Sequence, residues 1–226
     1  MKELGYCVEC RKLSNDKVCP NCQNIIRNNW RECLPERYRL SDFSQFDNIP
    51  RKIIKWLSVY ASNFVSGERY SKTGLIIYGD VGVGKTMLVS ALCNCIIDRV
   101  ACNYRSQYSP IIWKPDQQFV SECQWANSAR GDKPLHELIE DLSNKTKNRL
   151  LVIDDVGKGT PRLDVALSSY NFLIDQIYNK LGWLVIVSNY SLSETKEYLG
   201  YYAVDRLIQL CGTNFMFEMK GDSLRE

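Results

Sequence analysis

The chain has 226 residues, of which 45% are hydrophobic and 24% charged, and it carries a formal net charge of +3. This length and composition are typical of one α/β domain with a small appendage. They exclude a membrane-spanning helix, because no stretch approaches about 20 unbroken apolar residues. The charge is compatible with a nucleic-acid partner without establishing one. Since the N-terminus lacks an apolar signal core, we expect a cytoplasmic protein with no membrane partner.

Four cysteines stand at paired spacing near the N-terminus, Cys7 with Cys10 and Cys19 with Cys22. Each C-x2-C turn presents two thiolates to one ion, so two turns complete a tetrahedral Zn²⁺ site. A pair of redox-active motifs is the alternative. A unit this short buries no core of its own, so metal binding should supply most of its folding energy. We interpret the other cysteines as free thiols: Cys33, Cys93, Cys95, Cys102, Cys123 and Cys211.

Composition divides the chain into three parts. Residues 1–30 form the cysteine-rich unit, residues 31–50 a linker and lead-in, and residues 51–226 the main domain. The polar stretch over residues 23–43, punctuated by Pro35, is typical of a connector.

The main domain alternates between helices and strands in the way that a parallel sheet requires. Its first helix is predicted over residues 49–66, where apolar residues recur at helical spacing up to Gly67. Uniformly apolar strands indicate burial on both faces, so the predicted architecture is a three-layer α/β/α sandwich around a parallel sheet. We expect strands over residues 75–78, 111–113, 150–153, 184–187 and 215–219, and helices over residues 85–99, 117–129, 166–179, 193–199 and 204–210.

The segment after the first predicted strand fits the pattern G-x-x-x-x-G-K-[ST] and opens the next helix, as a P-loop must. Its glycines let successive backbone N–H groups turn toward phosphates, and the helix N-terminus adds its positive end. Lys85 would reach the β- and γ-phosphates, and the Thr86 hydroxyl would coordinate Mg²⁺. The alternative is a glycine-rich turn with a chance lysine. The predicted nucleotide-binding residues are Gly79, Asp80, Val81, Gly82, Val83, Gly84, Lys85, Thr86 and Met87.

Two aspartates follow the apolar run at residues 150–153, where a P-loop NTPase needs a carboxylate at the end of a neighbouring strand. We assign Asp154, together with Thr86, to Mg²⁺. Asp155 is the candidate general base for the attacking water. The alternative is a strand that simply runs into an acidic turn.

Two further polar residues are candidates for the same site. Asn189 follows the apolar run at residues 184–187, so it either positions water at the γ-phosphate or caps the next segment. Arg206 has apolar helical neighbours. It either pairs within its own chain, with Asp205 or Glu197, or projects into a neighbouring subunit's nucleotide site as an arginine finger.

Taken in order, these motifs resemble the AAA+ ATPases, and more narrowly the DnaC/DnaI-type replicative helicase loaders and their IstB-type transposition relatives. The resemblance runs from Leu34 to Glu226 and rests on LPERYRLSDF, GLIIYGDVGVGKT, LLVIDDVG, IVSNYSLSE and DRL. The Asp-Asp pair narrows it, because most AAA+ proteins have Asp-Glu there. GDSLR is similar to the family's C-terminal Gly-x-x-x-Arg, which implies a nucleotide-binding role for Arg225.

The resemblance implies an ATP switch that works only in an assembly, where Arg206 of one subunit completes the site of the next. The implied partners are a hexameric DnaB-type replicative helicase, single-stranded DNA and further copies of the chain. Some related loaders carry an N-terminal zinc-binding domain that docks on the helicase, so we expect that role for residues 1–30. DNA binding or simple stabilisation are the alternatives. The implied catalytic residues are Lys85, Asp155, Asn189 and Arg206, and the implied cofactors are ATP, Mg²⁺ and Zn²⁺.

The residues between Cys102 and Asn148 match the family only loosely, and the family places its single-stranded DNA contacts there. Aromatic and basic side chains are present in this segment, but such aromatics are more often core, so no DNA-contact residue is assigned. Three rival functions are an IstB-type transposition helper, a module that holds ATP only as a structural ligand, and an initiator that binds duplex DNA. The cysteine unit disfavours the first, the Asp-Asp pair the second, and the lack of a helix-turn-helix extension after Glu226 the third.

Overall fold

The computed structural model of the chain describes residues 5–14, 18–47, 49–68, 72–103, 108–128, 131–157, 163–221 and 223. At its centre is a parallel sheet with the strand order β4-β5-β6-β3-β7, so the predicted parallel sheet is confirmed. Because β3, β5 and β6 are neighbours, the segments that follow them meet at one edge of the sheet. The strands are β3 (Gly74–Gly79), β4 (Ile111–Pro115), β5 (Leu150–Val156), β6 (Trp183–Ser188) and β7 (Met216–Met219).

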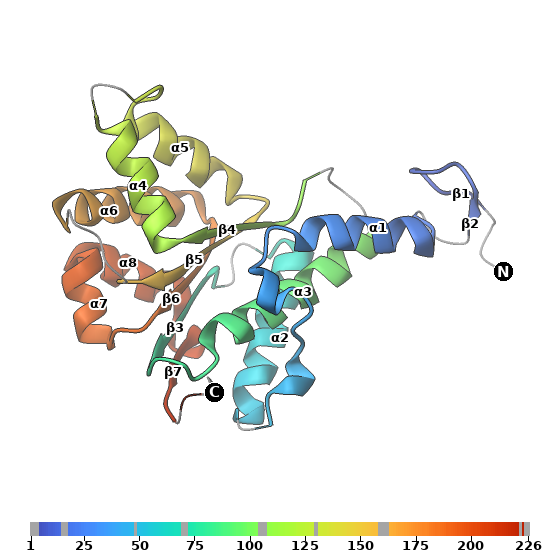
Figure 1. Cartoon of the computed structure of the whole chain (residues 1–226), viewed down its shortest axis with the longest axis horizontal. Helices are drawn as coiled ribbons and strands as arrows, with labels where there is room; N and C mark the ends of the chain where they lie inside the picture. The colour runs from blue at the N-terminus through green and yellow to red at the C-terminus, as the bar shows by residue number, and fades with distance from the viewer. Residues whose placement is uncertain are drawn as a thin grey trace.

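Helices cover both faces of the sheet, which confirms the predicted three-layer sandwich. In Figure 1, α2 and α3 lie on one side of the sheet and α4 to α8 on the other. Every residue of β6 is buried because both of its faces are covered. These helices are α2 (Arg51–Ser66), α3 (Lys85–Asn103), α4 (Asp116–Ala126), α5 (Leu135–Lys145), α6 (Leu163–Lys180), α7 (Leu192–Leu199) and α8 (Tyr201–Cys211), with 3-10 turns η1 (Glu36–Tyr38), η2 (Phe43–Gln45) and η3 (Thr213–Phe215).

Helix α5 is an element that the sequence analysis did not predict. Leu135, Leu138, Ile139 and Leu142 recur at helical spacing and pack in or against the main core, so the apolar stripe of a helix was present in the sequence and was missed. It packs against α6 and α4 and adds a second helix between β4 and β5. Helix α4 ends at Ala126, before the predicted end of the helix over residues 117–129.

Another helix, α1 (Pro20–Arg31), occupies the beginning of the predicted connector, so that part of the prediction is wrong. Pro20 opens the helix, where its missing N–H is not needed. The other end is fixed to the main body, because Trp30 and Leu34 are buried in the main core. In addition, the Arg31 guanidinium pairs with Asp98 of α3 at 2.8 Å. Because the exposed side of α1 is polar, the sequence reads as a connector and does not reveal that the end of the helix is anchored in the main core.

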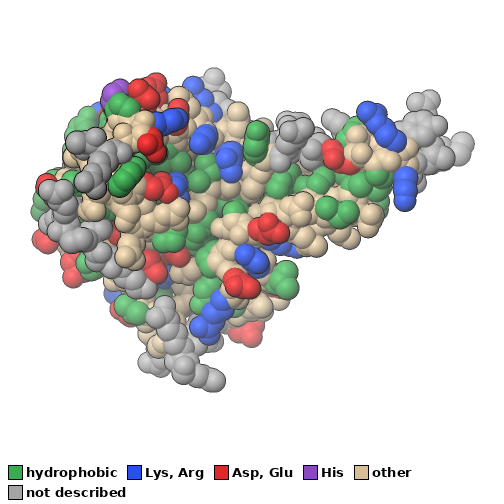
Figure 2. Space-filling model, turned by 45° about the horizontal axis from the view of Figure 1, so that its top comes forward, with side chains coloured by type: hydrophobic (Ala, Val, Ile, Leu, Met, Phe, Trp, Pro, Cys, Tyr) green, Lys and Arg blue, Asp and Glu red, His purple; other side chains and the backbone are tan. Residues whose placement is uncertain are grey.

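The N-terminal end of α1 carries a second, very small core. Strands β1 (Gly5–Tyr6) and β2 (Leu13–Ser14) pair antiparallel, and Cys7, Val18 and Cys22 are buried beside them. Figure 1 shows this unit away from the sheet at the far end of α1, and the space-filling view in Figure 2 shows an arm that projects from the main body. None of the helices that the structure describes is long and apolar enough to cross a bilayer.

Candidate nucleotide and metal sites

The segment from Gly79 to Thr86 joins the carboxyl end of β3 to the first turn of α3. Gly79, Gly82 and Gly84 have φ angles of 122°, 87° and 90°, which other residues rarely adopt. A Cβ atom at Gly79 would lie 2.1 Å from the carbonyl oxygen of Met219 on β7. The glycines therefore allow a tight turn from β3 into α3 with β7 packed closely beside it, and the N-terminus of α3 provides backbone donors for an anion.

Lys85 turns back into this loop. Its side chain is buried, and Nζ donates a hydrogen bond to the carbonyl oxygen of Gly79 at 2.9 Å and another to that of Asp80. The segment after β7 crosses the same loop, since the Gly221 N–H donates to the Asp80 carboxylate at 3.3 Å. The predicted nucleotide contact Arg225 lies outside the described residues.

Thr86 faces the first of the two aspartates. Its hydroxyl donates a hydrogen bond to Asp154 Oδ1 at 3.1 Å, although the two residues are far apart in the sequence. The carboxylate of Asp154 is 5% exposed, so water alone does not solvate it. A hydroxyl and a buried carboxylate oxygen side by side are ligands that fit Mg²⁺ beside a nucleotide. The structure thus brings together the pair that the sequence predicted for the metal.

Asp155 points elsewhere because the backbone of β5 is irregular at this position. The β5–β6 register shifts between Ile153 and Val156, and Asp155 has a φ of 59°. Such bulges re-aim side chains, and they are common beside active sites. Here the Asp155 carboxylate accepts a hydrogen bond from the Asn189 side-chain amide at 3.1 Å. The two candidate residues for positioning water are therefore in direct contact.

A buried carboxylate beneath this edge escaped the sequence analysis. Asp116, at the start of α4, is 1% exposed, and burial raises its pKa above the ordinary value. It accepts hydrogen bonds from the hydroxyls of Tyr170 at 2.6 Å and Tyr198 at 2.9 Å, and from the Gly157 N–H at 3.0 Å. Gly157 directly follows β5, so Asp116 fixes the turn beyond the aspartate pair. The available signal was an aspartate directly after the predicted strand at residues 111–113 and its Lys-Pro extension.

The same turn is tied to the segment after β6. The Tyr190 hydroxyl donates to the Gly157 carbonyl at 2.7 Å, and Tyr190 follows Asn189 in the sequence. The rings of Tyr190 and Tyr198 are in edge contact, with centroids 6.2 Å apart. The segments that carry Asp155 and Asn189 are thus held by one network of hydroxyl and carboxylate groups.

Arg206 does not join this cluster within its own chain. Its guanidinium pairs with Asp175 of α6, donates to the Tyr202 hydroxyl, and lies over the ring of Tyr202 at 4.3 Å from its centroid. The ring of Tyr178 is also within 5.1 Å. The intrachain alternative named Asp205 or Glu197 as partner, and the partner is instead Asp175, because α6 packs against α8. A role in a neighbouring subunit stays a prediction.

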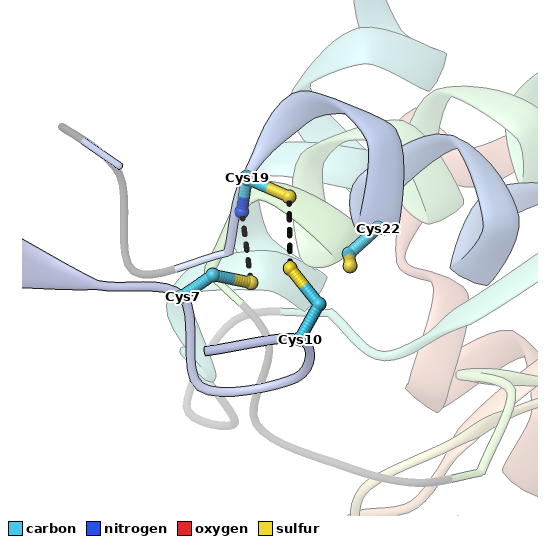
Figure 3. Close-up of side chains that lie close together, drawn as sticks. All are labelled: Cys7, Cys10, Cys19 and Cys22. Carbon is cyan, nitrogen blue, oxygen red and sulfur yellow. Dashed lines mark hydrogen bonds between the residues drawn. The ribbon is translucent and has the colours of Figure 1, made fainter. Parts of the chain in front are cut away.

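The four paired cysteines converge at the far end of α1. Their Sγ atoms all lie within 4.8 Å of one another, and those of Cys10 and Cys19 are 3.6 Å apart. Sulfur atoms bound to one tetrahedral zinc at about 2.3 Å would be separated by roughly 3.8 Å, so this geometry fits such an ion. Figure 3 shows Cys7 and Cys10 on the turn after β1, facing Cys19 and Cys22 on the first turn of α1.

Backbone donors stabilise a thiolate in this cluster. The Cys19 N–H donates to Cys7 Sγ at 3.3 Å, and this contact and a second backbone donor at Cys10 lower the pKa of Cys7 to about 6. Burial, together with the neighbouring sulfur atoms, raises the pKa of Cys22 to about 12. Four such groups at one point favour a divalent cation that compensates their negative charge.

No protein-family model and no curated protein matches the sequence. The fold, however, is similar to that of the DnaC helicase loader, with a TM-score of 0.62 at 19% identity over 82% of this chain and 100% of that one. It is also similar to DnaI, with a TM-score of 0.54 at 19% identity over 82% and 93% of the two chains.

A replication initiator, DnaA bound to AMPPCP and single-stranded DNA, matches with a TM-score of 0.55 at 19% identity. That match covers 84% of this chain and 51% of the initiator. At such identities the likeness concerns the fold. The chain therefore shares its fold with the DnaC and DnaI structures and with part of the DnaA structure.

Proposed function

We propose that the chain is an ATP-hydrolysing switch that loads a replicative DNA helicase onto single-stranded DNA. The observation that carries the proposal is the pairing of Thr86 with Asp154 and of Asn189 with Asp155 at one edge of an AAA+ sheet. The P-loop lies at this edge as well, so the residues that we propose for the phosphates, the metal and the water are close together. ATP hydrolysis at such a site gives two states, one with and one without the γ-phosphate.

The proposed roles follow from the chemistry of the groups. The loop from Gly79 to Thr86 would hold the phosphates, with Lys85 swinging from its carbonyl partners to the β- and γ-oxygens. Thr86 and Asp154 would hold Mg²⁺, which would neutralise charge on the phosphates. Asp155 would accept the proton of the attacking water, and Asn189 would orient that carboxylate and the water.

Completion of the site by a neighbouring copy is part of the proposal. Arg206 is the candidate finger, and it would have to leave Asp175 to reach the next subunit's γ-phosphate. The rate of ATP hydrolysis would then depend on assembly, because the nucleotide site of a lone subunit lacks the arginine of a neighbour. We propose Arg225 as a further nucleotide contact from the same chain.

The partners are proposed from the described functions of similar folds. DnaC, whose structure covers the same fold, is described as a helicase loader, and DnaA was solved with single-stranded DNA. We propose a hexameric DnaB-type helicase and single-stranded DNA as the partners, in the cytoplasm. An IstB-type transposition helper would share the same ATPase motifs, so the partner is what distinguishes the two functions.

The cysteine unit is proposed to bind Zn²⁺ through Cys7, Cys10, Cys19 and Cys22 and to dock on the helicase. Residues 1–30, 31–50 and 51–226 are the proposed zinc unit, lead-in and ATPase domain. Helix α1 crosses the first boundary, since its end carries Trp30 into the main core. A deletion of residues 1–30 would therefore damage the ATPase core as well as the metal site, and ligand substitutions are the better probe.

The test is capture of a purified DnaB-type helicase by the full-length chain in the presence of AMPPCP and Mg²⁺. The proposal expects capture by the wild type and by Cys95→Ser, a thiol control outside the paired spacing. It expects loss of capture with Cys7→Ser combined with Cys10→Ser. Absence of capture by the wild-type chain would remove the loader function. Capture by the ligand variant at wild-type level would remove the docking role of the cysteine unit alone.

A further inference from the structure

A large groove opens at the edge of the sheet opposite the nucleotide site. Its volume is about 1310 Å³, and its lining comes from the α2–β3, α5–β5 and α6–β6 connections and from the segment before β4. These connections precede the strands, whereas the P-loop and Asn189 follow β3 and β6, and Asp154 lies near the carboxyl end of β5. The groove is therefore a surface separate from the nucleotide site.

The groove is strongly basic. Lys145, Lys147, Arg149 and Lys180 line it, and the described lining residues include no aspartate or glutamate. This is a local charge of +4 in a chain whose formal net charge is only +3. Lys145 and Lys147 are exposed, so their ammonium groups can reach a ligand. Such a concentration of one sign attracts a polyanion.

Two of these cations are oriented by neutral partners. Arg149 donates from Nε to the Ser109 carbonyl at 2.8 Å and from Nη2 to the Ile111 carbonyl at 3.1 Å. Lys180 donates to the Ser143 hydroxyl at 2.8 Å. Carbonyl and hydroxyl oxygens hold a cation in place without cancelling its charge. The groove is thus preorganised for anionic groups.

The backbone beside Lys180 is in an uncommon conformation. Leu181, which lines the groove and is 42% exposed, has a φ of 50° at the end of α6, where glycine is the usual residue. The other non-glycine residues with positive φ in the described ranges are Arg11, in the cysteine unit, and Asp155, in the nucleotide site. Backbone conformations of high energy concentrate at functional positions. Leu181, the third such residue, exposes an apolar side chain in the basic groove.

The shape and the remaining lining decide which polyanion fits. The volume exceeds the roughly 300–1,000 Å³ of a small-ligand pocket, so the groove has room for a segment of a polymer. Tyr108 lines the groove and is 70% exposed, which offers a ring on which a base can stack. Basic side chains combined with exposed aromatic and apolar ones are the pattern of single-stranded nucleic-acid binding, because phosphates meet the cations and unpaired bases meet the rings. An acidic peptide would use the charges alone.

We propose that this groove binds single-stranded nucleic acid, with Lys145, Lys147 and Lys180 on the phosphates and Tyr108 stacked on a base. This assignment gives the single-stranded DNA partner a surface on the chain, and in that respect it rests on the proposed function. The groove lies away from the ATP site, so DNA and ATP can be held at the same time.

The test measures binding of the full-length chain to a fluorescent 20-nucleotide oligo(dT) by anisotropy at several salt concentrations. Lys145→Ala combined with Lys147→Ala should weaken binding at least about tenfold and reduce the salt slope by about 1.4, since each phosphate contact on a single strand contributes about 0.7. Tyr108→Leu should weaken binding about tenfold with an unchanged slope, because stacking releases no counterions. Melting temperature and AMPPCP affinity, measured on the same preparations, should match those of the wild type.

The matched control is Lys52→Ala combined with Lys55→Ala, which removes the same charge from two exposed lysines of α2 outside the groove. If this control loses as much affinity as the groove pair, or if the groove pair binds as the wild type does, the groove assignment is overturned. An equal loss for oligo(dT) and for poly-glutamate would overturn it as well, since the groove would then select charge alone. Oligo(U) of the same length distinguishes RNA from DNA as the source of the strand.

The outcomes for the groove and for the loader function are distinguishable. A chain that binds oligo(dT) through the groove but captures no helicase retains the groove and loses the loader function. A chain that captures helicase equally well with and without the groove lysines, and binds no oligo(dT), retains the loader function and loses the groove.

Discussion

The Asn189 side-chain amide donates a hydrogen bond to the Asp155 carboxylate at 3.1 Å and so joins the ends of two neighbouring strands. The neighbouring carboxylate, Asp154, accepts from Thr86 instead. Two successive aspartates therefore serve two different partners, because the positive φ of Asp155 turns its side chain away from that of Asp154. One carboxylate is thus directed to Thr86, the proposed metal ligand, and the other to Asn189, which we propose orients water.

Substitution of Asp155 tests this division. Asp155→Asn should bind a fluorescent ATP analogue with unchanged affinity, whereas its rate of phosphate release should fall by about 100-fold or more, because an amide does not accept the proton of water. Asp47→Asn, at an exposed position, is the matched control. Phosphate release at the wild-type rate by Asp155→Asn would remove the general-base assignment.

Arg206 should act only in an assembly. Arg206→Ala should leave nucleotide affinity unchanged and remove the rise in ATPase rate per chain that the wild type shows with increasing protein concentration, a loss on the order of 10³-fold if the arginine acts as a finger. Arg51→Ala, an exposed arginine on α2, is the control. A variant with the wild-type concentration dependence would assign Arg206 to its own chain alone.

The ion pair between Arg206 and Asp175 provides a second test of the role of Arg206 in an assembly. Since Arg206 contacts Asp175 within the chain, Asp175→Asn should free the guanidinium and lower the protein concentration needed for half-maximal ATPase activity. The shift is measured on the same concentration series. A higher required concentration would mean that Asp175 orients Arg206 toward the neighbour rather than restraining it.

Asp116 should contribute to the pH dependence of the free energy of unfolding. Its pKa is raised in the folded protein above the unfolded value of about 3.9, so the folded state keeps a proton that the unfolded state releases. The contribution of Asp116 to stability is therefore largest below that value and falls as the pH rises through the raised pKa.

Asp116→Asn removes this titration. An asparagine has only one acceptor oxygen for three donors, so the variant should lose about 1–3 kcal/mol of unfolding free energy. In urea titrations over a pH series, the advantage of the wild type should shrink as the pH rises from the ordinary carboxyl value. An advantage that is constant or grows with pH would contradict the raised pKa. The ATPase rate of the variant should fall more than its nucleotide affinity, since Asp116 supports the turn at Gly157.

Metal removal should unfold the cysteine unit. We expect one zinc per chain, and a chelator should release it and lower the melting temperature, because this unit has almost no other core. Cys22→Ser should give the same melting temperature with and without chelator, whereas Cys95→Ser should respond as the wild type does. A wild-type chain that contains no zinc when purified from zinc-supplemented medium would contradict the prediction.

The sequence was sufficient for the sheet and for the positions of the motifs. Strands such as β5 and β6 are continuous apolar runs, and their burial on both faces leaves little alternative to a parallel sheet. Helices α2, α3, α6 and α8 all appear within a few residues of their predicted positions. The fold class was predictable because it depends on hydrophobic patterns that repeat over many residues.

Most of the missed features depend instead on contacts between distant residues. Helix α5 is the exception, because its apolar residues recur at helical spacing and were a usable local signal, whereas the anchoring of α1 depends on the contact of Trp30 with the main core. Asp116 looks like an ordinary turn residue until Tyr170 and Tyr198 surround it. Likewise, the partner of Arg206 follows from how α6 packs on α8, which no local pattern encodes.

Helix α1 connects the cysteine unit to α3, the helix that begins at the P-loop. Cys19 caps the start of the helix and Cys22 lies on its first turn, and about 12 residues on, or roughly 18 Å at 1.5 Å per residue, its last turn contacts α3 through Arg31. The first turn of α3 in turn contains Lys85 and Thr86. A displacement of the cysteine end of α1 would therefore be passed through the Arg31–Asp98 contact to α3, the helix that begins at Lys85.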